Sequence, residues 1–386
     1  LDLCLLFTHK KDTLTKVYQN FIPLTKKMLA LHKFINILMY CLIATGLSVV
    51  LYPRYIRLLK YLKAGKTIRE VSATGEKSEI FTQLHAHKAG TPTMWGGLFI
   101  IIMLIMIALS FLIQKLGIIN FSLWNPQETY IILFGFFSMG LIGVADDFLN
   151  IKNFGKIKWL SAKTKLIGMF LFSAWISYWF YWVLGVDYIN LRPLGGKIEV
   201  WLWFPVLTFI ATIAIVNAIN ITDGLDGLAG GLMMIILTSL GLVTFLNGTY
   251  IATTVVGILV AVLGAFLFFN INPAKVFMGD SGAFALVGIL SALIYLLNMR
   301  FGIVIPFIII FGIFILELCS SGLQIFWKKV FKRKLFAMAP FHHLLEHRGI
   351  KETTIVMKMW LIQGVLAVAA IILILVEYVL MKHGNL

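Results

Sequence analysis

Residues 250–297 read YIATTVVGILVAVLGAFLFFNINPAKVFMGDSGAFALVGILSALIYLL, and this stretch decides the fold class of the chain. Two apolar runs, 250–269 and 283–298, are separated by a short segment that contains one lysine and one aspartate. A helix that crosses a bilayer needs about 20 mostly apolar residues. The stretch therefore predicts two membrane spans that are joined by a tight polar loop.

The composition of the whole chain agrees with this interpretation. Of the 386 residues, 60% are hydrophobic and only 13% are charged, whereas about a quarter of an average soluble protein is charged. These values exclude a soluble globule and also a disordered chain, which would be poor in apolar residues. Three cysteines without a pairing or metal-site spacing exclude a disulfide-built scaffold.

Working outward from residues 250–297 gives ten candidate spans in an all-α polytopic membrane protein. They are residues 34–52, 94–114, 130–149, 166–186, 200–220, 225–246, 250–269, 283–298, 303–327 and 359–381. We expect residues 34–386 to form one ten-span domain. Residues 1–33, whose apolar stretches are interrupted by lysines, are expected to form an N-terminal leader that is either irregular or amphipathic.

The basic residues predict the orientation of these spans. The alternate loops 53–93, 150–165, 270–282 and 328–358 carry 22 Lys and Arg residues, and the opposite loops carry four. Cytoplasmic loops of membrane proteins are enriched in Lys and Arg. We therefore expect the basic loops in the cytoplasm and both termini outside, although six lysines in residues 1–33 run against the rule. The net charge of +16 is assigned to these loops and to anionic headgroups or substrates, not to nucleic acid.

Five aspartates fall at the predicted cytoplasmic ends of spans: Asp146, Asp147, Asp223, Asp226 and Asp280. Acidic side chains at this depth are expensive unless they are paired, bound to metal or facing water. Helix capping is the alternative explanation for each one taken singly. Because adjacent helical positions point about 100° apart, we expect one of Asp146 and Asp147 to face a cavity and the other to bind a lysine or a metal.

The remaining three aspartates accompany glycines at two predicted helix starts. Asp223 and Asp226 are three residues apart, and Asp280 lies between Gly279 and Gly282. Helix N-termini favour anions, while Mg²⁺ binds one or two carboxylates together with phosphate oxygens. The pattern suits a magnesium-bound diphosphate. It does not suit zinc, because no His or Cys set has the required spacing.

Basic and histidine-containing loops supply the complementary groups. Lys88 and Thr93 in loop 53–93 can bind phosphate or a base edge, and His342 and His343 can donate to phosphate or sugar. Solvated loop residues remain an equal alternative for the two histidines. Glu317 is an acid inside the ninth span and is a functional candidate, with a hydrogen bond within the bundle as the alternative.

Five motifs occur in one order: GTPTM-W-GG at 90–97, ADD at 145–147, NITDGLDGLA at 220–229, PAKVFMGDSG at 273–282 and MAPFHH at 338–343. Over roughly residues 34–381 the chain resembles the phospho-N-acetylmuramoyl-pentapeptide-transferase family, which belongs to the polyprenyl-phosphate N-acetylhexosamine-1-phosphate transferase superfamily. Four departures from the family pattern are an inserted Trp95, Asn150 in place of a lysine, Leu344 in place of a third histidine, and Trp159 in place of a glycine.

The resemblance implies a reaction in the bacterial inner membrane. UDP-N-acetylmuramoyl-pentapeptide and undecaprenyl phosphate would give lipid I and UMP at the cytoplasmic face, with Mg²⁺, as the first membrane step of peptidoglycan synthesis. A homodimer is left open, and no nucleic acid partner is expected. Two rival functions are transfer of N-acetylglucosamine-1-phosphate to polyprenyl phosphate and a cation- or proton-coupled transporter. A transporter would place its acids at the bilayer midplane and show related halves.

The resemblance also implies roles for individual residues. Asp280 would be the principal magnesium ligand, with Asp147 as a second candidate, and Asp146 would act on the lipid phosphate as a base or nucleophile. His342 and His343 would hold the amino sugar and phosphate, and Phe277 would stack on uracil. The other implied substrate-binding residues are Lys88, Thr93, Asn220, Asp223, Gly224, Leu225, Asp226, Asn270 and Gln324.

Overall fold

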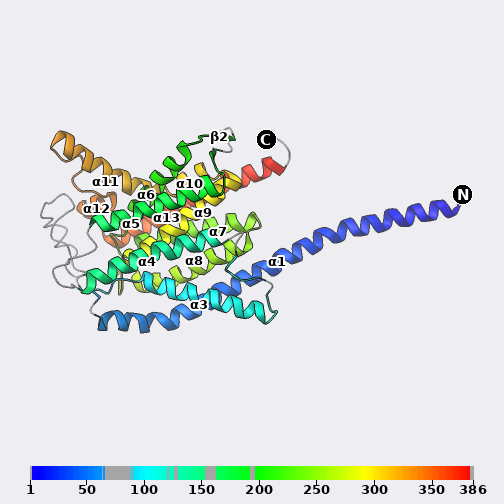
Figure 1. The fold of residues 1–386 in the computed structure, drawn as a ribbon, viewed down its shortest axis with the longest axis horizontal. Coiled ribbons are helices and arrows are strands. Elements are labelled where there is room, and N and C mark those ends of the chain that lie inside the picture. Colours follow the sequence, from blue (N-terminus) through cyan, green and yellow to red (C-terminus); the bar gives the residue numbers. More distant parts are fainter. Residues whose placement is uncertain are drawn as a thin grey trace.

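A computed structural model of the chain describes residues 2–62, 64–65, 88, 90–119, 121–125, 129–152, 162–191 and 196–382. The described helices form an elongated bundle (Figure 1). Their bounds are α1 Asp2–Tyr61, α3 Gly96–Lys115, α4 Tyr130–Lys152, α5 Ala162–Tyr178, the π-helix η2 Trp179–Val183, α6 Trp203–Thr222, α7 Leu228–Leu246, α8 Tyr250–Asn270, α9 Gly279–Phe301, α10 Val304–Ile310, α11 Gly312–Phe331, α12 Phe341–His347 and α13 Glu352–Lys382.

The predicted membrane architecture is confirmed with one correction. Nine of the described helices are long and apolar enough to span a membrane. The predicted ninth span, 303–327, is not one straight helix but a pair, α10 and α11, that bends by 72°. At the break, the side-chain amide of Gln363 on α13 donates a hydrogen bond of 2.6 Å to the carbonyl oxygen of Ile310. This bond satisfies a backbone group that an unbroken helix would pair internally.

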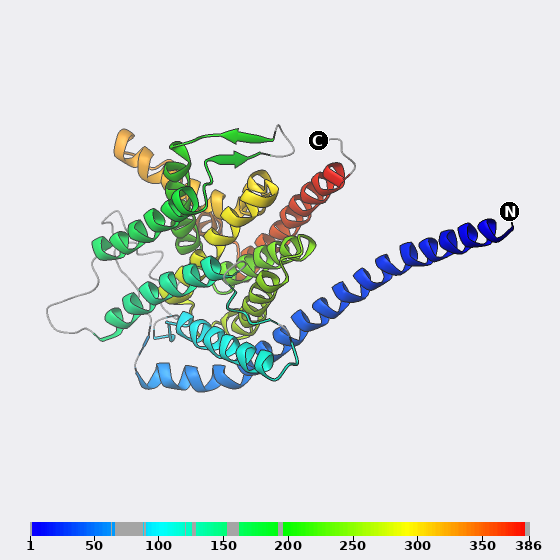
Figure 2. The ribbon, with the colours of Figure 1, turned by 45° about the vertical axis from the view of Figure 1, so that its right-hand side comes forward.

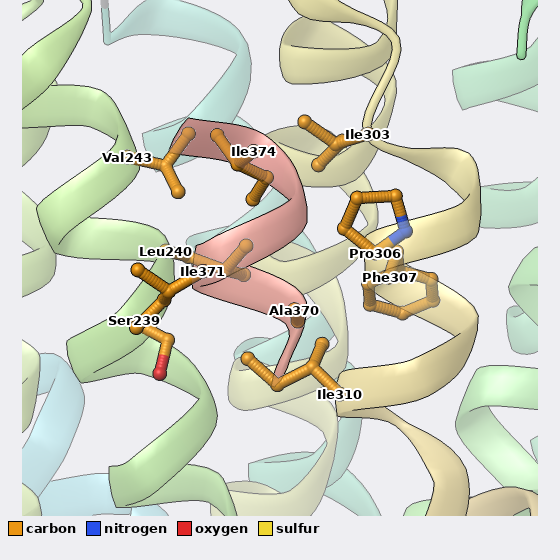
Figure 3. Close-up of a pocket in the computed structure, with 10 residues that line it drawn as sticks. All are labelled: Ser239, Leu240, Val243, Ile303, Pro306, Phe307, Ile310, Ala370, Ile371 and Ile374. Atoms are coloured by element: carbon orange, nitrogen blue, oxygen red, sulfur yellow. The ribbon is translucent and has the colours of Figure 1, made fainter. Parts of the chain in front are cut away.

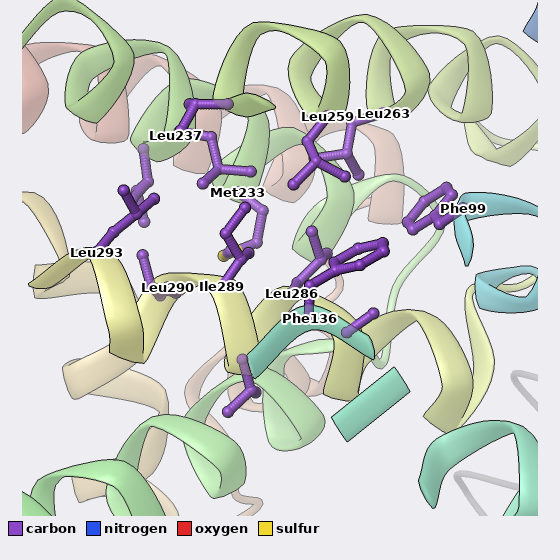
Figure 4. Close-up of a cluster of buried hydrophobic side chains, with 14 of the residues drawn as sticks. Phe99, Phe136, Met233, Leu237, Leu259, Leu263, Leu286, Ile289, Leu290 and Leu293 are labelled. Atoms are coloured by element: carbon purple, nitrogen blue, oxygen red, sulfur yellow. The ribbon is translucent and has the colours of Figure 1, made fainter. Parts of the chain in front are cut away.

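The helix α9 is the centre of the bundle. Its membrane-spanning window is 89% buried, more than that of any other candidate span in the described chain. Figure 4 shows Leu286, Ile289, Leu290 and Leu293 of α9 among side chains of α3, α4, α7 and α8. Helices that are apolar all round are buried ones. The position of Asp280 in the first turn of α9 is therefore fixed by the core itself.

The first helix is longer than a span. α1 runs without a break from Asp2 to Tyr61, and residues 28–61 qualify as a span. Residues 2–33 thus have a helical backbone that is continuous with the first span, while the division of the chain at residue 34 stays a prediction. Figures 1 and 2 show α1 changing direction toward its C-terminal end. Pro53 lies in that part of α1 and lacks the amide hydrogen that an unbent helix would use.

The two ends of the bundle differ in structure. Figures 1 and 2 place the start of α1 and the end of α13 at the same end of the bundle. At this end a small antiparallel hairpin, β1 Tyr188–Asn190 and β2 Lys197–Glu199, lies within a loop for which no strand was expected. The Tyr188 hydroxyl donates to the carbonyl oxygen of Met299 near the end of α9. The hairpin and Asp280 therefore mark opposite ends of the same buried helix.

The inserted Trp95 is part of the packing, and an apolar cavity lies elsewhere in the bundle. The inserted Trp95 is fully buried, and its ring centroid lies 4.2 Å from that of Tyr52. Figure 3 shows an apolar cavity between α7, α10 and α13, lined by Leu240, Pro306 and Ile371 among others. The cavity lies beside the broken span, where the short helix α10 packs against α13.

Candidate active site

Close approach of two helices creates the first part of the candidate site. Gly135 and Gly143 of α4 pack directly against the backbone of α9, at Gly288 and at the Asp280–Ser281 peptide. A Cβ atom at any of these glycines would overlap backbone atoms of the other helix. Small residues allow helix backbones to approach in this way. The contact brings the C-terminal part of α4, with Asp146 and Asp147, beside the first turn of α9.

Asp147 caps the start of α9. Its carboxylate oxygens accept hydrogen bonds from the backbone amides of Asp280, at 3.2 Å, and Ser281, at 2.9 Å. A carboxylate at a helix N-terminus is favoured by the unpaired amides and by the helix dipole. Gly279 has φ +71°, and a Cβ atom there would lie 2.6 Å from an Asp147 oxygen. The glycine is therefore required for both the turn and the cap.

Asp146 and Asp280 converge on a lysine. Both carboxyl groups lie beside the same ammonium group. The Lys165 ammonium lies 2.6 Å from an Asp280 oxygen and 3.9 Å from an Asp146 oxygen. One half of the expected division is found, because Asp146 lies beside a lysine. The other aspartate, Asp147, caps a helix start, where the expectation was a side chain that faces a cavity. Asp280 is about a quarter exposed and is therefore accessible to a ligand.

A second charged cluster surrounds Asp226, which follows α6. The Lys88 ammonium lies 2.8 Å from an Asp226 oxygen and 2.6 Å from an oxygen of Glu352, at the start of α13. The same Glu352 oxygen accepts the Asp226 backbone amide at 2.6 Å. The other Asp226 oxygen accepts the Asn272 side chain and the Ala274 amide, both at 3.0 Å. Asp226 therefore fixes the loop that leads from α8 to α9.

Other predicted substrate-binding residues border this cluster. The side-chain amide of Asn270 donates to the carbonyl oxygen of Val276 and accepts the backbone amide of Gly227. Leu225 and Phe277 are buried, and the Phe277 amide donates to the carbonyl oxygen of Pro92. The loop through Thr93 is tied to Ala64 by a backbone hydrogen bond of 2.8 Å.

Asn220 and Asp223 lie at the C-terminal end of α6 and are half-buried. Gln324 of α11 lies with a different segment, because it binds the backbone of Leu335 and Phe336.

The predicted histidines occupy α12, where an acid orients the first one. The Glu317 carboxylate accepts the backbone amide of His342 at 3.2 Å and pairs with its Nδ1 at 3.0 Å, with both side chains fully buried. The opposite ring atom, Nε2, is directed at Gly224, because a Cβ atom on Gly224 would lie 2.5 Å from it. That buried nitrogen has no hydrogen-bond partner in the described structure. His343 pairs instead with Glu346 at 2.6 Å.

The described donor groups are compatible with a divalent cation. No three His, Cys, Asp or Glu side chains are grouped as a preformed metal site in the described part of the chain. Asp146 and Asp280 nevertheless present two neighbouring carboxyl groups beside the Lys165 ammonium. Mg²⁺ usually binds one or two carboxylates and completes its shell with water or phosphate. Asp147 is committed to backbone amides.

Sequence reasoning did not single out two of these residues. Lys165 is one lysine of a basic loop, and Glu352 lies more than a hundred residues from Asp226. The available signal for Lys165 was its position directly before the fourth apolar run. No signal pointed to Glu352, because only the folded chain brings α13 beside Lys88.

Comparisons with known proteins agree with this arrangement. A model of glycosyl transferase family 4 matches residues 129–298, which include Asp146, Asp226 and Asp280. The phospho-N-acetylmuramoyl-pentapeptide-transferase of Clostridium botulinum (strain Eklund 17B) is 34% identical, over 83% of this chain and 91% of its own length. Enzymes of that name from Thermoanaerobacter sp. (strain X514), 35% identical over 85% and 95%, and Geobacillus sp. (strain WCH70), 34% identical over 81% and 90%, match equally well. The chain therefore belongs to the phospho-N-acetylmuramoyl-pentapeptide-transferase family.

Proposed function

We propose that this chain transfers phospho-N-acetylmuramoyl-pentapeptide from its UDP-linked donor to undecaprenyl phosphate, giving lipid I and UMP. The activity for which its relatives are named supports the reaction. The observation that carries it is the contact of Asp146, Asp280 and Lys165 at one end of a membrane bundle. A lipid phosphate and a water-soluble nucleotide can meet only at a membrane surface.

The transfer reaction depends more on stabilising the negative charge of the phosphates than on covalent catalysis by a side chain. An oxygen of the lipid phosphate attacks the phosphorus that carries the sugar, and the bond to UMP breaks. Catalysis of phosphoryl transfer rests largely on positioning and electrostatic stabilisation. In this proposal Lys165 stabilises negative charge on the transferred phosphate, and Asp147 fixes the start of α9 so that Asp280 stays beside Lys165. Asp146 either positions the lipid phosphate or acts on it directly.

We propose Mg²⁺ as the cofactor, held by Asp280 and Asp146. When bound, it would neutralise charge on the diphosphate of the donor. Asp147 is assigned the capping role, because both of its oxygens accept backbone amides. It stays the second candidate ligand, since each carboxylate oxygen has a further lone pair.

The Asp226 cluster is proposed as the nucleoside side of the site. Lys88, Asp226 and Glu352 hold the loop after α6 against the start of α13. Asn220, Asp223, Gly224 and Leu225, at the end of α6 and in this loop, are assigned to the nucleoside. Phe277 and Thr93 follow on adjoining segments, and Phe277 is proposed to stack on uracil. His342, directed at Gly224, and His343 are assigned to the sugar and phosphate.

We further propose that this end of the bundle faces the cytoplasm of a bacterium, in its inner membrane. The support is the excess of Lys and Arg in the loops at this end, 22 against four in the opposite loops. Both termini would then lie outside the cell. Lys165 and Lys88 belong to these basic loops, so the same charges would serve orientation and substrate binding.

The decisive experiment measures UMP release by the purified full chain. The donor is offered as UDP-N-acetylmuramoyl-pentapeptide or UDP-N-acetylglucosamine, each with and without undecaprenyl phosphate. We expect UMP only from the muramoyl donor and only with the lipid present. Equal or faster release from UDP-N-acetylglucosamine would contradict the proposal and indicate a sugar-only transferase. No release from either donor, with Mg²⁺ present, would contradict an enzymatic function.

A further inference from the structure

A cavity outside the candidate active site is lined by basic side chains from two distant segments. Arg57 and Lys60 come from α1, and Lys275 comes from the loop between α8 and α9. Together with Thr91, Pro92 and Phe269 they border an open cavity of about 570 Å³. None of the described residues that line it is acidic. We propose that this basic cavity binds the phosphate of an anionic phospholipid headgroup.

The location of the cavity favours a lipid over a soluble anion. Arg57 and Lys60 lie at the inner end of the first membrane span, in the part of α1 that includes Pro53. On the same turns, Leu58, Tyr61 and Leu62 are exposed, with Tyr61 84% accessible. A helix end that presents apolar and basic side chains together suits the boundary between acyl chains and headgroups. A phospholipid whose phosphate lies in the cavity would thus have its acyl chains beside this apolar surface.

The basic cavity is separate from the transfer site but shares a wall with the nucleoside loop. Asp146, Asp280 and Lys165 are not among the residues that line it. Ala274 lines the cavity, and its backbone amide is the one that donates to Asp226. Pro92 also lines it, and its carbonyl oxygen accepts the Phe277 amide. The proposal concerns binding alone and does not depend on the transfer reaction.

Native mass spectrometry of the detergent-purified full chain tests the proposal. Phosphatidylglycerol or phosphatidylcholine is titrated into the protein, and the fraction of lipid-bound chain is measured. A basic residue near a membrane surface contributes about 1 kcal/mol to binding of anionic lipid, which corresponds to about fivefold in affinity. We expect Arg57→Gln and Lys275→Gln each to weaken phosphatidylglycerol binding about fivefold and to leave phosphatidylcholine binding unchanged.

Arg54→Gln is the matched control. Arg54 lies on the same helix and is exposed, but it does not line the cavity, and its guanidinium donates to the carbonyl oxygen of Val50. We expect this variant to bind phosphatidylglycerol like the unmodified chain. An equal loss in all three variants would overturn the proposal, because it would indicate diffuse surface charge.

Two competition experiments identify the bound group. Inorganic phosphate at the same concentration should leave phosphatidylglycerol bound, and its displacement would show a site for free anions instead. Polyprenyl phosphate at the same concentration should also leave it bound. Displacement by the polyprenyl phosphate would overturn the proposal, because the cavity would then be part of the acceptor site.

Discussion

At the scale of single residues, Lys165, whose ammonium lies beside Asp146 and Asp280, gives the first prediction about the transfer chemistry. Lys165 is 2.6 Å from Asp280 and packs its ammonium 5.0 Å from the Phe284 ring centre. Removing one group that stabilises charge in a transition state typically slows turnover about 10²- to 10³-fold. We expect Lys165→Met to show a loss of this size in kcat, measured as UMP release at saturating donor and lipid.

The control for this variant is a lysine at the opposite end of the bundle. Lys115→Met removes the same charge from an exposed position at the end of α3. It should turn over at the unmodified rate. If Lys165→Met retained more than a tenth of the activity, Lys165 would be a structural partner of Asp280 and not part of the transfer chemistry.

Asp280 gives the second prediction, which concerns the metal. Asn keeps the size of the side chain but removes the charge that Mg²⁺ prefers in a ligand. We expect Asp280→Asn to stay folded, to lose most of its activity and to lose Mg²⁺ binding measured directly by calorimetry. Unchanged turnover at saturating Mg²⁺ would contradict the assignment of Asp280 as the principal ligand.

Because Glu317 orients His342, the effect of changing Glu317 on kcat should depend on whether His342 is present. The test therefore compares a double variant with the two single variants. The carboxylate binds both the amide and the Nδ1 of His342 and thereby directs Nε2 at Gly224. We expect Glu317→Gln and His342→Gln each to lower kcat, and the double variant to be no slower than His342→Gln alone. Residues that act as a unit show such non-additive losses. Additive losses would show that Glu317 supports the bundle independently of the histidine.

The candidate site could be predicted from the sequence in part. The aspartates were found because acids are rare in this chain and five of them lie at span ends. Their separate roles could not be predicted, because Asp146 and Asp147 are distinguished only by which side of α4 faces α9. Glu352 was missed for a similar reason, since its partners lie on other segments.

At the scale of helices, α4 and α9 hold the site together through glycine contacts. A Cβ atom at Gly288 would overlap the carbonyl oxygen of Gly135. Overpacking a close contact typically costs about 1–3 kcal/mol, so Gly288→Ala should lower the apparent Tm in detergent. Gly364→Ala is the matched control, because nothing lies within 4 Å of a Cβ atom at that position of α13. This control should be as stable as the unmodified chain or slightly more stable, as alanine favours helix.

The number and order of the spans could be read from the apolar runs, but the break in the ninth could not. Residues 303–327 are mostly apolar, with Glu317 as their one charged residue, and long enough to cross a bilayer. At the break, Gln363 of another helix binds the Ile310 carbonyl oxygen, a contact that the local sequence of the span does not reveal. Hydropathy reports whether a segment prefers lipid, whereas the direction of a helix depends on tertiary contacts of this kind.

At the scale of the whole molecule, the chain is polarised along its long axis. Every proposed substrate contact lies toward the end where α9 begins, and the hairpin and both terminal helix ends lie toward the other. The 23 residues of α9 span about 34 Å at 1.5 Å per residue, which is close to the thickness of a bilayer core. One buried helix therefore separates the reactive end from the opposite surface.

This polarity gives the last prediction, which concerns orientation. Arg348 follows α12 at the reactive end, and Lys197 lies in β2 at the hairpin end, and both are exposed. In a chain whose three native cysteines are replaced by serine, Arg348→Cys and Lys197→Cys are treated in spheroplasts with a membrane-impermeant maleimide. If the 22 basic residues fix the loops inside, Lys197→Cys reacts at once and Arg348→Cys reacts only after permeabilisation. The reverse pattern would place the reactive end outside, where a cytoplasmic nucleotide donor could not reach it. Labelling of Arg348→Cys on purified protein in detergent is the control, because it shows that the thiol itself is accessible.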